Sequence, residues 1–335
     1  MHKKIDILNI GLIGISLAIA FILPFKLFLF SYAFLGPLHY LTEINWLKEK
    51  QYFLKADSKW IRIFIIFTVL LTIYPIYRII DLGLSTSFEE AIKYIFGKQK
   101  IIVLTAFFFA IGLILFRKLK HLLLTLGFSF LLAILLFLYL PKWLFVLGLF
   151  LPTIIHVYLF TLLFMLYGSK KSKSVMGYVG SGLLLIVPLI IAFVTIDPGS
   201  YVVSKETATI YDTSRLMRVN LVMTQMFGGL IDGKFYILST MGIKIQVFIA
   251  FAYTYHYLNW FSKTSIIGWK KSLTTRRTIY ILIIWAAAIG IYMYDFYTGL
   301  MALYFLSLLH VFFEFPLNVI TIKELFNFKI RKVKA

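Results

Sequence analysis

The 335-residue chain has no cysteine and few charged residues. The absence of cysteine excludes disulfides, thiolate metal sites and cysteine nucleophiles. Only 14% of the residues are charged and 61% are hydrophobic, whereas a soluble domain is nearer a quarter charged and half apolar. We find no phosphate-binding loop, dinucleotide fingerprint, G-x-S-x-G or H-E-x-x-H motif. The composition therefore indicates a membrane protein without the common soluble-enzyme motifs.

Long apolar runs predict an all-α, polytopic helix bundle that forms one integral membrane domain over residues 1–335. A membrane span needs about 20 predominantly apolar residues. We predict about ten spans, at 7–23, 27–46, 60–80, 101–116, 122–140, 143–167, 175–196, 236–261, 278–298 and 300–322. Gly36-Pro37 interrupts the second run, which we expect to be kinked or re-entrant. No small-x-small cleavage site follows residues 1–23, so we interpret them as a retained helix.

The net charge of +20 is concentrated in alternate loops. With the N-terminus inside, the inside loops are 1–6, 47–62, 117–121, 168–174, 262–277 and 323–335. These loops hold 23 Lys and Arg residues, against nine in the outside loops. This asymmetry predicts that both termini lie inside. It also favours anionic membrane lipids over nucleic acid as partners. The Lys, Ile, Phe and Tyr usage favours the bacterial cytoplasmic (inner) membrane.

The longest loop, 197–235, is predicted to lie outside. Asp212-Thr213-Ser214 resembles a helix N-cap, apolar residues at helical spacing follow it, and Gly228-Gly229 is a stop signal. We expect a short amphipathic helix here, either lying on the membrane surface or serving as an ordinary connection.

Four histidines and two glutamates lie inside predicted spans, where such groups are costly and usually face a partner, a cavity or an ion. They are His39, Glu43, His156, His256, His310 and Glu314. In His39–Glu43 and His310–Glu314, a spacing of four puts both side chains on one helix face. The predicted topology brings all six to similar depth. We expect a shared site, although a single membrane histidine often only hydrogen-bonds a neighbouring helix.

The residue types favour a metal site. Sets of histidine and carboxylate suit non-haem iron and zinc, so we expect His39, His156, His256 and His310 to be ligands of iron, or of zinc. Glu43 and Glu314 would be catalytic, as ligands or as bases that orient imidazoles. Axially ligated haem and a His/Glu proton relay remain alternatives. Nearby polar residues that could support the ligands are Tyr40, Thr42, Tyr158, Tyr255, Tyr257, Asn259 and Asn318.

Four short elements resemble those of the Brp/Blh family of bacterial and archaeal membrane proteins, which is linked to cleavage of β-carotene into retinal. The matching elements are Gly36-Pro37-Leu38-His39 with Glu43, Ile154-Ile155-His156, Tyr253-Thr254-Tyr255-His256, and Leu308-Leu309-His310 with Glu314. The chain departs from the family in having Glu43 at the first acidic position, in having only His256 in the third element, and in its greater length. The resemblance implies an iron-dependent enzyme that acts on an apolar isoprenoid.

These patterns favour a membrane oxidoreductase of the dioxygenase-like type, acting on a lipid-soluble substrate such as an isoprenoid or carotenoid. Two alternatives stay open. One is a proton-coupled transporter that uses the buried His/Glu set together with Lys244. The other is a non-catalytic assembly subunit whose buried polar groups only hold helices together.

Overall fold

The computed structural model describes residues 2–50, 61–80, 87–90, 94, 98–116, 118–264, 266, 268 and 273–326. Within these residues the regular secondary structure is helical, apart from one isolated bridge between Ile231 and Lys234. The all-α prediction is therefore confirmed. The predicted inside loops 47–62, 117–121, 262–277 and 323–335 lie partly outside the described residues.

Six helices of the described structure are long and apolar enough to cross a membrane, which indicates an integral membrane protein. They are Lys3–Ile22, Leu119–Tyr139, Pro141–Ser172, Val175–Phe193, Thr275–Tyr294 and Tyr304–Leu325. Two shorter apolar helices cover Arg62–Tyr77 and Gln99–Leu115. The count of about ten spans and the inside position of both termini stay predictions.

Each predicted span overlaps one or more helices. The first three correspond to α1 (His2–Ile22), to α2 (Pro24–Phe30) with the π-helix η1 (Ser31–Leu35) and α3 (Gly36–Lys50), and to α4 (Ile61–Ile80). The next four correspond to α6 (Gln99–Leu115), to α7 (Leu119–Tyr139), to α8 (Pro141–Phe150) with the π-helix η2 (Leu151–Phe160) and α9 (Thr161–Ser172), and to α10 (Val175–Phe193). The last three correspond to α13 (Thr240–Ser262), α14 (Thr275–Tyr294), and α15 (Phe296–Ala302) with α16 (Tyr304–Leu325).

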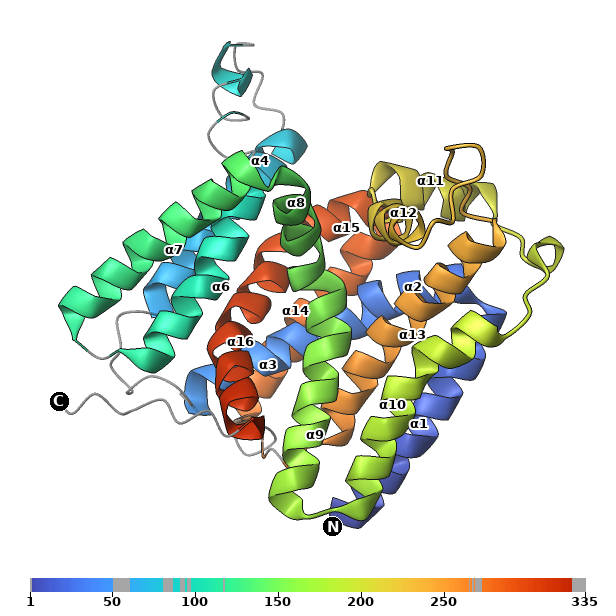
Figure 1. Ribbon diagram of the computed structural model, residues 1–335, viewed down its shortest axis with the longest axis horizontal. Coiled ribbons are helices and arrows are strands. Elements are labelled where there is room, and N and C mark those ends of the chain that lie inside the picture. The colour runs from blue at the N-terminus through green and yellow to red at the C-terminus, as the bar shows by residue number, and fades with distance from the viewer. Residues whose placement is uncertain are drawn as a thin grey trace. The chain divides into compact units, whose positions relative to one another are not determined.

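Where we predict one domain, the chain forms two compact units, each built from two segments. The first unit comprises Met1–His39 and Val157–Leu300. Its central helix is α13, which packs against α1, α2, α10 and α12 and lies beside α1 and α10 in Figure 1. Most of the side chains of α13 are buried. Because neighbouring helices cover it, α13 can carry Gln246, His256 and Asn259 where a lipid-facing helix would be apolar.

The second unit comprises Tyr40–His156 and Met301–Ala335. Its most buried helix is α16, which packs against α4 and α6, and α6 in turn packs against α7 and α8. The buried side of α16 runs from Leu308 to Thr321 and contains His310, Glu314 and Asn318. In both units, therefore, the most enclosed helix carries one of the predicted metal ligands.

The 197–235 segment holds two helices instead of the one we predicted: α11 (Lys205–Thr213) and α12 (Met217–Met226). The N-cap predicted at Asp212-Thr213-Ser214 is wrong, because these residues end α11. The sequence signal for α11 lies earlier, at Ser204, whose hydroxyl accepts a hydrogen bond from the backbone N–H of Thr207. The stop is confirmed, because α12 ends just before Gly228, which has a φ of 70°.

Buried hydrogen bonds attach this segment to α13. The amide of Gln246 donates to the Tyr211 hydroxyl at 2.7 Å. Asn220 donates to the Gly242 carbonyl at 2.9 Å and to the Gln246 side-chain oxygen at 3.2 Å. Burial raises the pKa of Tyr211, so its hydroxyl keeps its proton and donates it to the Phe25 carbonyl. The segment is thus packed onto the first unit.

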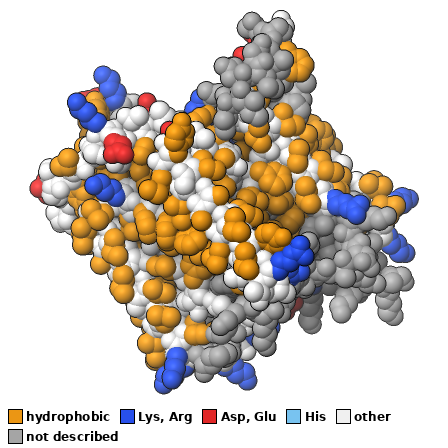
Figure 2. Space-filling view, turned by 180° about the vertical axis from the view of Figure 1, so that it is seen from behind, with side chains coloured by type: hydrophobic (Ala, Val, Ile, Leu, Met, Phe, Trp, Pro, Cys, Tyr) orange, Lys and Arg blue, Asp and Glu red, His pale blue; other side chains and the backbone are white. Residues whose placement is uncertain are grey.

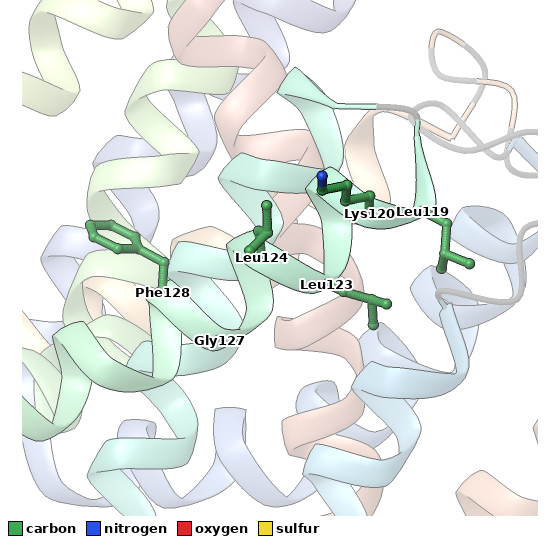
Figure 3. A pocket seen from close by; sticks show the side chains of 6 residues that line it. All are labelled: Leu119, Lys120, Leu123, Leu124, Gly127 and Phe128. Carbon is green, nitrogen blue, oxygen red and sulfur yellow. The ribbon is translucent and has the colours of Figure 1, made fainter.

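Hydrophobic side chains cover much of the described surface seen in Figure 2, with Lys and Arg side chains toward its margins. The helix α7 also has an exposed apolar face. Its exposed residues Leu123, Leu124 and Phe128, with Leu119, Lys120 and Gly127, line an open, apolar depression of about 770 Å³ (Figure 3). None of the six predicted site residues lies there. An exposed apolar face of this kind is typical of contact with lipid acyl chains.

Candidate metal centre

The first unit brings two of the predicted ligands together. His39 on α3 and His256 on α13 are 1% and 7% exposed, and their Nε2 atoms lie 3.1 Å apart. Their rings meet edge to face, with centroids 4.6 Å apart. Tyr257 and Trp260 also pack against the ring of His39. Two residues more than two hundred positions apart thus share one buried contact.

Thr161 contacts His256 through a shared hydroxyl. The Thr161 oxygen lies 2.9 Å from the Val157 carbonyl, to which it can donate, and 2.8 Å from Nδ1 of His256. When the hydroxyl donates to Val157, it accepts from Nδ1–H, and the lone pair of Nε2 then faces His39. This is the tautomer that a metal ligand needs.

The second unit brings the other two histidines together. His156 and His310 are buried, and their Nε2 atoms lie 3.2 Å apart. Nδ1 of His156 lies 2.8 Å from Oε2 of Glu314, which places a carboxylate beside this imidazole. The ring of Tyr40 stacks on that of His310, with centroids 5.6 Å apart.

Glu43 belongs to the same unit and is 3% exposed. It interacts electrostatically with Glu314, which is itself buried. Two carboxylates that share a buried site repel one another unless a proton or a cation lies between them. This pair therefore creates a demand for positive charge next to His156 and His310.

The histidine pairs have a spacing that suits metal coordination. Two nitrogens that bind one metal ion at about 2.0–2.1 Å lie about 2.8–3.4 Å apart when their angle at the metal is between about 90° and 110°. Both Nε2–Nε2 distances, 3.1 and 3.2 Å, fall in this range. The buried histidine and glutamate groups could thus hold a metal ion.

Irregular helical turns position two of the histidines. The π-helix η1 ends at Leu35, just before the Gly36-Pro37 step that leads to His39. The π-helix η2 contains both Pro152 and His156. Proline has no N–H for the helical ladder and crowds the preceding turn, and a wider π turn is a common response at functional sites. The helix continues through Gly36-Pro37 as η1 and α3, as expected for a kinked span.

The segments that carry His39 and His156 share a local structure that the sequence motifs do not reveal. Leu23, with φ −134° and ψ 52°, precedes Pro24, and Leu140, with φ −132° and ψ 53°, precedes Pro141. Each histidine then follows its proline by fifteen residues. The signal that could have linked the two segments is this spacing, because their other side chains differ.

The remaining polar residues divide into those that contact a site histidine and those that do not. Tyr40 and Tyr257 contact site histidines. In contrast, the Tyr158 hydroxyl donates to the Leu184 carbonyl, and that of Tyr255 contacts Asn9 and Met165. Lys244 is likewise engaged elsewhere, with the Ala192 carbonyl. Sequence reasoning missed Thr161, because its partner His256 is 95 positions away.

Comparison with known proteins adds no relative. No protein-family model, no curated protein and no solved structure matches this chain. The resemblance to the Brp/Blh family therefore stays a prediction that rests on the four short elements and their histidines.

Proposed function

We propose that this chain is a membrane metalloenzyme whose buried His/Glu groups bind metal and act on a lipid-soluble substrate. The observation that carries the proposal is the pairing of histidine nitrogens, 3.1 Å apart in His39–His256 and 3.2 Å apart in His156–His310. All four histidines are 7% exposed or less. Ionisable groups buried at membrane depth usually face a partner, a cavity or an ion.

The donor set favours iron over zinc. Several histidines with carboxylates are typical of non-haem iron sites that keep open positions, whereas structural zinc sites are usually closed by four ligands. His39, His156, His256 and His310 would be metal ligands, and Glu43 and Glu314 would bind metal or orient the imidazoles. A redox-active ion would supply oxidative chemistry of the dioxygenase-like type that the Brp/Blh resemblance implies.

The surroundings favour a lipid-soluble substrate. The six residues lie in a chain whose helices are long and apolar enough for a bilayer, and the phenol rings of Tyr257 and Tyr40 pack against His39 and His310. A molecule that dissolves in the hydrocarbon layer can reach such a site without crossing water. An isoprenoid or carotenoid fits this description. The bacterial cytoplasmic membrane is the location that we propose.

The proposal is tested by elemental analysis and absorption spectroscopy on the detergent-purified protein and on the His156→Ala and His310→Ala variants. We expect stoichiometric iron in the wild-type protein, at least a tenfold loss in each variant, and no Soret band. The matched control is His121→Ala, because His121 lies on α7 and contacts only Phe116 among the ring contacts described.

Three results would contradict the proposal. A wild-type protein without bound metal would remove the metal centre. A Soret band would replace it with haem. Equal metal content in the wild-type and His156→Ala proteins would show that any metal is bound elsewhere.

A further inference from the structure

Asn318 on α16 is buried without a hydrogen-bond partner. It is 1% exposed, and neither its Nδ2 nor its Oδ1 has a partner in the described structure. A buried polar group left unsatisfied costs about 1–3 kcal/mol, and such groups are rare in folded proteins. An amide buried at this cost calls for a partner that the described residues do not supply.

The position of Asn318 connects it with the proposed metal centre. His310, Glu314 and Asn318 follow one another at intervals of four on α16, so all three lie near one face of the helix. With a rise of 1.5 Å per residue, Asn318 is about 6 Å from Glu314 and about 12 Å from His310 along the axis. The unsatisfied amide is thus aligned with two proposed metal-site residues.

Buried aromatic residues lie on the same helix as Asn318. Phe312 and Phe315 are fully buried and pack with each other, and Phe315 also packs against Phe107 of α6. A hydrocarbon chain suits such surroundings, but it cannot satisfy an amide. A hydroxyl group can do so, because it can donate to Oδ1 or accept from Nδ2.

We propose that Asn318 binds the hydroxyl group of the substrate, which is therefore a lipid-soluble alcohol and not a pure hydrocarbon. The apolar chain of the alcohol would extend from Asn318 along α16 past Glu314 and His310. The reacting carbon would then lie about 6–12 Å from the hydroxyl oxygen, according to the rise of the helix. This inference rests on the proposed function for the identity of the reacting site, but not for the binding of the alcohol.

The first test separates a binding role from a structural one. The Asn318→Leu variant replaces the amide with an apolar group of similar size. If the amide is unsatisfied in the free protein, this variant should unfold at the same or a higher temperature than the wild type. A clearly lower midpoint temperature would show that Asn318 supports the fold, and would overturn the proposal.

The second test measures equilibrium binding of a radiolabelled C20 isoprenoid alcohol and of the hydrocarbon with the same skeleton. We expect the wild-type protein to bind the alcohol about tenfold to a hundredfold more tightly than the hydrocarbon. The reason is that the hydroxyl group gives the Asn318 amide a hydrogen-bond partner that it otherwise lacks. Asn318→Leu should lose this preference and keep its affinity for the hydrocarbon. Thr321→Val is the matched control, also buried on α16, and should keep the preference.

Equal binding of both probes to the wild type would overturn the inference, and would leave a trapped water as the partner of Asn318. Retention of the preference in Asn318→Leu would overturn it as well. Metal content, measured on the same preparations, separates this inference from the proposed function. Alcohol preference without metal contradicts only the metal centre, whereas metal without preference contradicts only the role of Asn318.

Discussion

At the scale of single residues, one hydroxyl group contacts the proposed ligand His256. Thr161 can donate to the Val157 carbonyl and accept from Nδ1–H of His256 at the same time. In that arrangement the Nε2 lone pair of His256 faces His39. Hydrogen bonds of this kind commonly orient metal-bound histidines.

We expect the Thr161→Val variant to bind metal about tenfold to a hundredfold more weakly, because valine keeps the shape but cannot accept the Nδ1–H hydrogen bond. Thr161→Ser keeps the acceptor and should bind as the wild type does. Competition with a graded series of chelators measures the affinities. If valine and serine at this position gave equal affinities, the orienting role of Thr161 would be wrong.

At the scale of helices, α13 joins the segment 197–235 to the helices of the first unit. Gln246 is 1% exposed and has three partners: the Tyr211 hydroxyl, the Asn220 amide and the Pro24 carbonyl. These partners come from α11, α12 and α2. A single amide thus connects three elements, and its loss leaves several buried polar groups unsatisfied.

The Gln246→Leu variant should lower the free energy of unfolding by about 1–3 kcal/mol, because Tyr211 and Asn220 each lose a buried partner. Gln225→Leu, a change of an exposed amide on α12, should stay within about 0.5 kcal/mol of the wild type. Chemical or thermal unfolding in detergent measures both. Metal content should not change, because Gln246 is ten residues, or about 15 Å, from His256. An unaltered stability would contradict this assignment.

At the scale of the whole molecule, the distribution of basic residues predicts that the segment 197–235 lies outside and the loop 168–174 inside. Ser200 and Ser172 are exposed residues of these two segments. The chain has no cysteine, so a cysteine introduced at either position is the only thiol of the protein. Its accessibility therefore reports on one side of the membrane.

In intact cells, a membrane-impermeant maleimide should label Ser200→Cys, because its segment is predicted to face outward. Ser172→Cys should be labelled only after the membrane is permeabilised. The opposite pattern would invert the topology, and labelling of both variants in intact cells would contradict the number of spans between them.

The sequence predicted the helices well, because a bilayer span requires a long apolar run and the chain contains many. It predicted the His39–Glu43 and His310–Glu314 pairs because helix geometry alone aligns residues four positions apart. It could not predict that His39 meets His256, or His156 meets His310, since these contacts depend on helix packing. Thr161 was missed for the same reason. Helix α11 was missed because Asp212-Thr213-Ser214 was interpreted as the start of a helix, whereas α11 ends there.

The ten-residue π-helix η2 has a consequence for how the chain tolerates changes in length. A π turn contains one more residue than an α turn, so its backbone hydrogen bonds form only if that residue is retained. Deleting a single residue between Leu151 and Ile155 would let the ordinary ladder re-form and would keep His156 close to its present phase relative to α8. Deleting a residue from the regular turns of α8 would instead rotate His156 by about 100° and turn its imidazole away from His310. The chain should therefore tolerate a one-residue deletion inside the π turn better than one in the regular helix before it.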